Sequence, residues 1–154
     1  GFLVRRLHNL LSGSWARDTG AAAAGTTAVQ AGVLILINEN PGVTQARLMK
    51  ALEVESATMV RSTSRLVEAG LVEKTRSPTD KRVFFLNLTA KGRAALVEIE
   101  RAMEARDRGL TEDVDPEDLK TFRRVARQLI AKRSAGAQAG LLDGLLFDPE
   151  EGGR

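Results

Sequence analysis

Two helical patterns in close succession, within residues 44–69, constrain the fold of this chain more than any other feature. Apolar residues recur at helical spacing in residues 45–52 and again in residues 56–69. Thr44 can cap the first helix, and Gly70 suits the left-handed backbone that ends the second. We therefore predict two short helices joined by a tight turn, the helix-turn-helix arrangement. The residues predicted to face the core are Ala46, Leu48, Met49, Leu52, Met59, Thr63, Leu66 and Val67.

Two β-prone stretches, residues 71–76 and 83–88, follow these helices directly. The second is rich in β-branched and aromatic residues, which favour strands. Between them, Ser77–Asp80 contains the Pro and Asp that are typical of a turn. We therefore predict a hairpin whose returning strand faces the core with Phe84, Leu86 and Leu88.

Helical patterns also occupy the N-terminal part of the chain. Residues 2–16 carry apolar side chains at near-heptad spacing, which is typical of a helix that packs on another helix. Thr27 and Gln30 have the spacing of a capping box at the start of a second helix. The apolar run Val33–Ile37 predicts that this second helix is buried, and Asn40–Gly42 ends it with turn residues.

Two longer helices are predicted after the hairpin. Thr89 can cap a helix that reaches about Arg108, and Pro116 suits the first turn of another that reaches Lys132. A helix-turn-helix followed by a hairpin is a winged helix. We therefore predict a mainly α fold with a small β-hairpin wing, flanked by N- and C-terminal dimerisation helices.

Four regions follow from this pattern. Residues 1–20 form an N-terminal dimerisation helix, and residues 26–92 form the winged helix-turn-helix region. Residues 93–133 form the C-terminal dimerisation helices, and residues 134–154 form a Leu-containing acidic tail that we expect to pack on the body or on a partner chain.

Composition excludes several classes of function. The 154 residues include no cysteine and one histidine, His8, so thiolate sites, cysteine nucleophiles and a histidine-rich metal site have no residues to form them. We expect no catalytic residues, no cofactor and no metal. No apolar run approaches the ~20 residues of a membrane span, and the absence of cysteine fits a reducing cytoplasm.

Positive charge is concentrated in the middle of the chain. Residues 61–93 contain eight basic and three acidic residues, although the whole chain carries a net charge of only +3. A helix of this arrangement fits the DNA major groove, and a hairpin tip that bears Lys81 and Arg82 can neutralise phosphates. Arg82 can also enter a narrow minor groove, where the negative potential is enhanced.

The order of these residues resembles the MarR (multiple antibiotic resistance regulator) family. The resemblance rests on Asp80-x-Arg82, then Leu88-Thr89 and Lys91-Gly92, preceded by the stretch Arg65–Val72, and it extends over residues 28–133. It implies a homodimeric, ligand-responsive DNA-binding regulator, usually a repressor. It also implies that Arg82 enters the minor groove and that Asp80 orients the wing tip through an ion pair. From the residues alone, Asp80 could equally cap the turn.

We expect the DNA-binding residues to come from three places: the start of the first helix of the pair, the outward face of the second, and the wing. They are Thr44, Gln45, Ser56, Ala57, Val60, Arg61, Ser64, Arg65, Lys74, Arg76, Asp80, Lys81 and Arg82. The alternative for Arg61 is a solvated surface side chain, and Arg65 could instead pair with Asp80 or Glu68. The sequence departs from the family at Glu55, where a Ser or Thr cap is frequent, and at Val60, where a polar residue is frequent.

The terminal helices supply two further predictions. Leu3, Leu7, Phe122, Leu129 and Ile130 are predicted to form a dimer interface, because the winged-helix core is already complete without them. By analogy with the family, a small aromatic or phenolic effector would bind between the dimer helices and the DNA-binding lobe. The candidate residues for that ligand are His8, Trp15 and Arg17; the alternative is that Trp15 is packing and Arg17 is surface.

Together these features predict a regulator that binds duplex DNA as a dimer at a pseudo-palindromic operator. The rival is a winged helix that serves as a protein-interaction scaffold. Such a scaffold would need neither a basic wing nor a basic recognition face, and the sequence has both.

Overall fold

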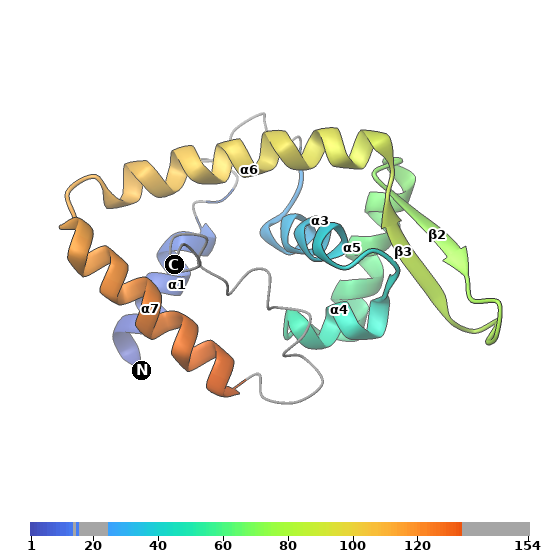
Figure 1. Cartoon of the computed structure of the whole chain (residues 1–154), viewed down its shortest axis with the longest axis horizontal. Coiled ribbons are helices and arrows are strands. Elements are labelled where there is room, and N and C mark those ends of the chain that lie inside the picture. The colour runs from blue at the N-terminus through green and yellow to red at the C-terminus, as the bar shows by residue number, and fades with distance from the viewer. Residues whose placement is uncertain (14, 16–24, 134–154) are drawn as a thin grey trace, which may run out of the picture.

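The computed structural model describes residues 1–13, 15 and 25–133 as an elongated, mostly helical molecule (Figure 1). One long helix, α6, runs along its length from the sheet and α3–α5 at one end to α1 and α7 at the other. The elements in chain order are α1 (Phe2–Gly13), α3 (Ala28–Glu39), β1 (Val43–Thr44), α4 (Gln45–Ala51), α5 (Ser56–Glu68), β2 (Val72–Arg76), β3 (Phe84–Leu88), α6 (Ala90–Thr111) and α7 (Pro116–Arg133).

Helix α3 forms the centre of the core, as its apolar run predicts. Val33, Leu34 and Leu36 are completely buried, and they pack with residues from α4, α5, the sheet and α6. The predicted capping box is confirmed, because Thr27 accepts from the Gln30 backbone and Gln30 accepts from the Thr27 backbone. The helix therefore begins with its free amides partly satisfied.

The helix-turn-helix prediction is confirmed in α4 and α5. Thr44 caps α4 by accepting from the Arg47 amide, and Gly70 follows α5 with a φ of +70°. Gln45 donates to the Thr63 hydroxyl at 2.7 Å, which ties the two helices together. The prediction for Ala46 was wrong: it is exposed, because it lies on the solvent side of the α4 turn that buries Leu48.

The predicted hairpin is part of a three-stranded antiparallel sheet in the order β1-β3-β2. Strand β1 was not predicted; its Val43 pairs with Leu86. Leu86 and Leu88 face the core as predicted, but Phe84 is 40% exposed. Phe84 misses the core because it lies at the wing end of β3, opposite Arg76 in the ladder.

Helix α6 starts where the sheet ends. Thr89 caps it through the Gly92 amide, as predicted, and Leu96 and Ile99 are buried against the core. Gly92 is required here, because a Cβ would lie 2.0 Å from the Leu71 carbonyl oxygen. Close contact with Leu71, the residue before β2, thus fixes the direction in which α6 leaves the sheet.

Helix α7 is capped by Asp115, which accepts from the amides of Glu117 and Asp118. Most of its apolar side chains are exposed, and so are most of those on α1. None of the described helices is long and apolar enough to cross a membrane. The acidic tail, residues 134–154, lies outside the described residues.

Candidate nucleic-acid interface

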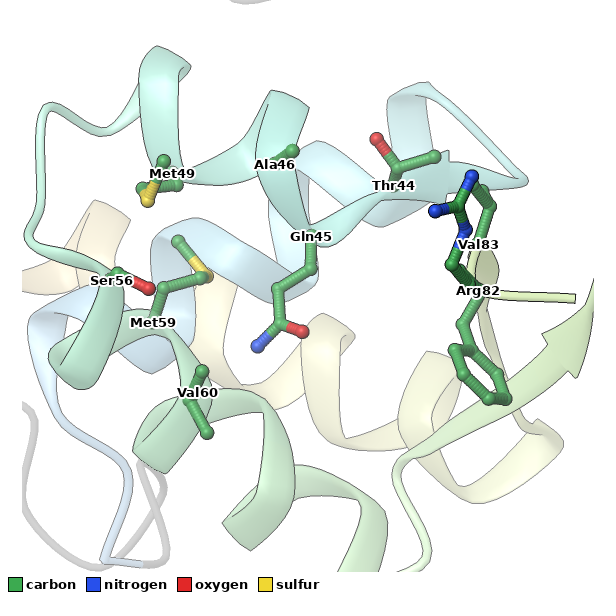
Figure 2. A pocket seen from close by; sticks show the side chains of 10 residues that line it. Thr44, Gln45, Ala46, Met49, Ser56, Met59, Val60, Arg82 and Val83 are labelled. Carbon is green, nitrogen blue, oxygen red and sulfur yellow. The ribbon is translucent and has the colours of Figure 1, made fainter. Parts of the chain in front are cut away.

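A groove of about 370 Å³ lies between α4, the start of α5 and the wing (Figure 2). Figure 2 shows Ser56 and Val60 on the α5 side of this groove, Arg82 on the wing side, and Gln45 between them. Five residues predicted to contact DNA line the groove: Thr44, Gln45, Ser56, Val60 and Arg82. The fold therefore brings residues from both helices and the wing to one surface.

Helix α5 presents the second part of this surface. Its buried side chains, Met59, Ser62, Thr63 and Leu66, form one face of the helix. The opposite face carries most of the predicted recognition residues. Ser56, Ala57, Val60, Arg61 and Arg65 are exposed there, and Ser64 is half-buried.

The N-terminus of α5 lacks a side-chain cap. Glu55 occupies the N-cap position, but its carboxylate accepts no capping hydrogen bond. The first backbone amides of α5 can therefore donate to solvent or to a ligand. These amides form the positive end of the helix dipole. A carboxylate at this position would repel a phosphate placed there.

The wing tip is organised by Ser77 and Asp80. Ser77 is buried, and its hydroxyl accepts from the amides of Thr79 and Asp80, both at 3.3 Å. The Asp80 carboxylate accepts from the Arg82 amide at 2.9 Å and lies 3.4 Å from the Arg82 Nε. Asp80 therefore both caps the turn and pairs with Arg82, so the two alternatives from the sequence occur together.

Arg82 is open to solvent: its side chain is 91% exposed, against 44% for Asp80. Its ion pair with Asp80 is held at the surface, where such pairs contribute little energy. The pair can orient the guanidinium without sequestering it. Arg65 does not take this place, because the partner of Asp80 is Arg82.

The remaining basic residues of the wing lie along its strands and tip. The Arg76 guanidinium lies 5.5 Å from the centroid of the Phe84 ring, on the neighbouring strand. Lys74 and Lys81 are exposed, one on β2 and one at the tip. A row of positive side chains therefore follows the wing from its base to its end.

Two predicted contacts already have roles within the fold. The Thr44 hydroxyl accepts from the Arg47 amide and so caps α4. The Gln45 side-chain amide donates to the Thr63 hydroxyl, so each side chain has only part of its hydrogen-bonding capacity left for DNA. Ser77, Met49 and Val83 were not among the predicted site residues, yet Ser77 is buried at the wing turn and the other two line the groove. Ser77 was predicted as part of the turn, and its position two and three residues before Thr79 and Asp80 is the signal for its hydrogen bonds to their amides.

The three residues predicted to bind an effector do not share one environment. Trp15 is buried in the core, its Nε1 donates to the Thr26 carbonyl at 2.9 Å, and the Arg106 guanidinium lies 5.9 Å from the ring centroid. His8 is exposed on α1, and Arg17 lies outside the described residues. Among the residues that the structure describes, no three His, Cys, Asp or Glu side chains could share a metal ion.

A second groove, of about 510 Å³, lies between α1, the end of α6 and the start of α7. Leu7 and Phe122 line it, and both were predicted to lie in a dimer interface. The other predicted interface residues are also exposed in the single chain: Leu3 by 79%, Leu129 by 61% and Ile130 by 45%.

The two helices, the three-stranded sheet and the basic wing define a winged helix-turn-helix protein. Residues 24–83 match the model of the MarR family. A Thauera aromatica protein, provisionally named a transcriptional regulatory protein for the hcr operon, is 36% identical over 107 residues, which are 70% of this chain and 64% of that protein. The chain thus spans less than two thirds of that relative's length.

Solved structures of this family have the same fold. A crystal structure of MarR superposes with a TM-score of 0.77 at 25% identity, over 85% of this chain and 88% of the other. The repressor CouR, solved on a 23-mer DNA duplex, superposes with a TM-score of 0.75 at 27% identity, over 84% and 90% of the two chains. This chain is therefore similar to members of the MarR family in both sequence and fold.

Proposed function

We propose that this protein is a transcriptional regulator that binds duplex DNA in a sequence-specific manner. The observation that carries the proposal is the common surface formed by the exposed face of α5, the groove beside it and the 91%-exposed Arg82 on the wing. A helix with such a face fits the major groove, and the wing then lies over the flanking backbone. DNA contact is supported by the CouR and MarR relatives, whose structures include DNA-bound complexes.

We further propose that the protein acts as a homodimer. The terminal helices expose large apolar side chains, and such a patch is costly unless another surface covers it. A two-fold dimer would present two copies of α5 to two half-sites about one helical turn apart on a pseudo-palindromic operator. CouR is described as a repressor, and repression is the regulatory sense we propose here.

Control by a small aromatic or phenolic effector is part of the same proposal. Support comes from the PcaV regulator, a neighbour of the same fold that was solved with its natural ligand. His8 and Trp15 lie on or next to α1, at the end of the molecule where the dimer would form. An effector there would weaken operator binding only if it bound one spacing of the two α5 helices more tightly than another. We propose that such a regulator acts in the cytoplasm, where it binds DNA and catalyses no reaction.

The test is a titration of the full chain against random duplex DNA at several salt concentrations. We expect binding at low salt and a steep fall as salt rises, because phosphate contacts release counterions. Arg82→Ala should weaken binding by about tenfold, the usual order for loss of an Arg contact. Arg101→Ala is the matched control: Arg101 is also an exposed arginine that pairs with a carboxylate, but it lies on α6.

Absence of binding at low salt would overturn the proposal and leave the protein-interaction scaffold as the better reading. Equal losses for Arg82→Ala and Arg101→Ala would reject the specific role of the wing. Both variants should keep the native circular dichroism spectrum, since both side chains are solvent-exposed.

A further inference from the structure

The part of the exposed α5 surface that lies nearest the wing is uncharged, and basic residues lie on both sides of it. Ala57, Val60 and Ser64 follow one another at spacings of three and four residues, so they form a stripe along the helix. Arg61 and Arg65 lie along one edge of this stripe. Figure 2 shows Val60 and Arg82 on opposite sides of the groove, so the other edge of the stripe faces the basic wing.

Val60 is unusual within this stripe because it is a large apolar residue that is 50% exposed. Its helix already has a complete buried face, and Val60 lies outside it. A branched side chain at this position also limits hydrogen bonding, because an isopropyl group neither donates nor accepts. If it faced the polar edge of a guanine or cytosine, it would remove water from donors and acceptors without replacing their hydrogen bonds.

Thymine is the base that presents an apolar group in the major groove, its C5-methyl. We propose that Val60, supported by Ala57, contacts a thymine methyl and makes thymine the preferred base at that position of each half-site. This inference rests on the proposed function, since it requires α5 to lie in the major groove. The arginines on both sides supply the phosphate contacts that hold the stripe against the bases.

The experiment uses deoxyuridine, which differs from thymidine only by lacking the C5-methyl. High-affinity duplexes are first selected from a random pool with the full chain, and each thymine of a selected duplex is then replaced in turn by uracil. We expect one or two replacements in each half-site to weaken binding by roughly fourfold, the factor for removing one buried methyl group. Other replacements should have no effect.

Three variants decide whether Val60 is responsible. Val60→Ala should bind the thymine and uracil duplexes equally. Val60→Thr, which keeps one methyl and the shape of the side chain, should retain part of the preference. Val97→Ala is the matched control, since Val97 is a similarly exposed valine (45%) on α6, and it should preserve the full uracil effect.

The outcomes separate this inference from the proposed function. If the chain binds selected duplexes but uracil changes nothing, or if the uracil effect persists in Val60→Ala, the thymine contact is wrong and DNA binding stands. If no duplex is bound at all, the proposed function fails first. Selection with Val60→Ala should also yield sites with less thymine at the sensitive position, and an unchanged site would overturn the inference.

Discussion

The winged-helix lobe, which runs from α3 to the start of α6, and the terminal helices α1 and α7 contain similar apolar residues but bury them to different extents. In the lobe, Leu34 and Leu36 have no exposed surface, and their neighbours from α3 to α6 enclose them within one chain. On the terminal helices, Phe2 is 80% exposed and Leu129 is 61% exposed. The same type of side chain is therefore buried within the chain in one region and exposed to solvent in the other. The first region has a complete core of its own, whereas the exposed side chains of the second are the ones for which we propose a dimer contact.

The largest effect should come from a truncation in the lobe. Leu34→Ala removes a fully buried side chain from α3, and we expect the free energy of unfolding to fall by about 2–5 kcal/mol. Chemical denaturation followed by circular dichroism measures this change. Val97→Ala, on the exposed side of α6, should cost under about 0.5 kcal/mol. Similar losses for the two variants would show that the lobe is not the stable unit.

The second largest effect is expected on dimer affinity, from two charged substitutions on α7. Leu129→Glu with Ile130→Glu places carboxylates on the exposed apolar surface, and we expect dimer affinity to fall by at least about thirtyfold. Sedimentation velocity at several protein concentrations would detect the shift to monomer. Val60→Glu, the same kind of change at comparable exposure, should leave the dimer intact and abolish DNA binding. A double variant that remained dimeric would place the interface elsewhere.

A smaller gain is expected at the start of α5. Glu55→Ser supplies the missing N-cap hydroxyl, which should raise the free energy of unfolding by roughly 0.5–1 kcal/mol. It also removes a carboxylate from the DNA-facing end of the helix, so DNA affinity should rise at low salt. Glu55→Gln is the control, because it removes the charge without providing a short capping side chain. Equal stability of the two variants would argue against the capping effect.

The smallest effect should come from α6. Burial, followed by the charges of Glu39 and Glu104, raises the pKa of Glu100 above its ordinary value of 4.5. The folded state then keeps the proton at pH values where the unfolded chain has lost it, so stability falls as pH rises through the raised pKa. Glu100→Gln should therefore stabilise the protein at neutral pH, but by under about 0.5 kcal/mol, because solvent screens the charges around this exposed side chain.

This gain should disappear below the ordinary pKa, where Glu100 is protonated in both states. Thermal melts at neutral and acidic pH would measure it. Adding Glu39→Gln should reduce the gain, because part of the repulsion has already been removed. A gain that is the same at both pH values would contradict the assigned cause.

Much of the lobe could be predicted because its signals are local. The capping box at Thr27, the cap at Thr44 and the left-handed Gly70 each depend on residues within a few positions. The wing charges were also predictable, since a turn between two strands must expose its tip. The errors at Ala46 and Phe84 arose where periodicity allowed burial but no neighbouring element was present to cover the side chain.

The availability of each charge for DNA could not be predicted in this way. Lys91 and Arg93 belong to the basic segment of the sequence, yet they donate to the carbonyls of Ala69 and Leu88, both at 2.8 Å. These bonds hold the start of α6 against the end of α5 and the end of β3. Arg82, by contrast, remains open beside Asp80. The number of basic residues in the sequence therefore overstates how many are free to contact DNA, because some of them form hydrogen bonds within the fold.

The sequence by itself determined the helices, their caps, the hairpin and the side chains at the wing tip, because these depend on spacing and on hydrogen bonds between near neighbours. Only the tertiary structure decided that Val43 pairs with Leu86 to add a third strand, that Ser77 is buried, and that a groove forms between Val60 and the wing. Those outcomes depend on which distant segments meet, and a local pattern carries no information about the surface that covers it.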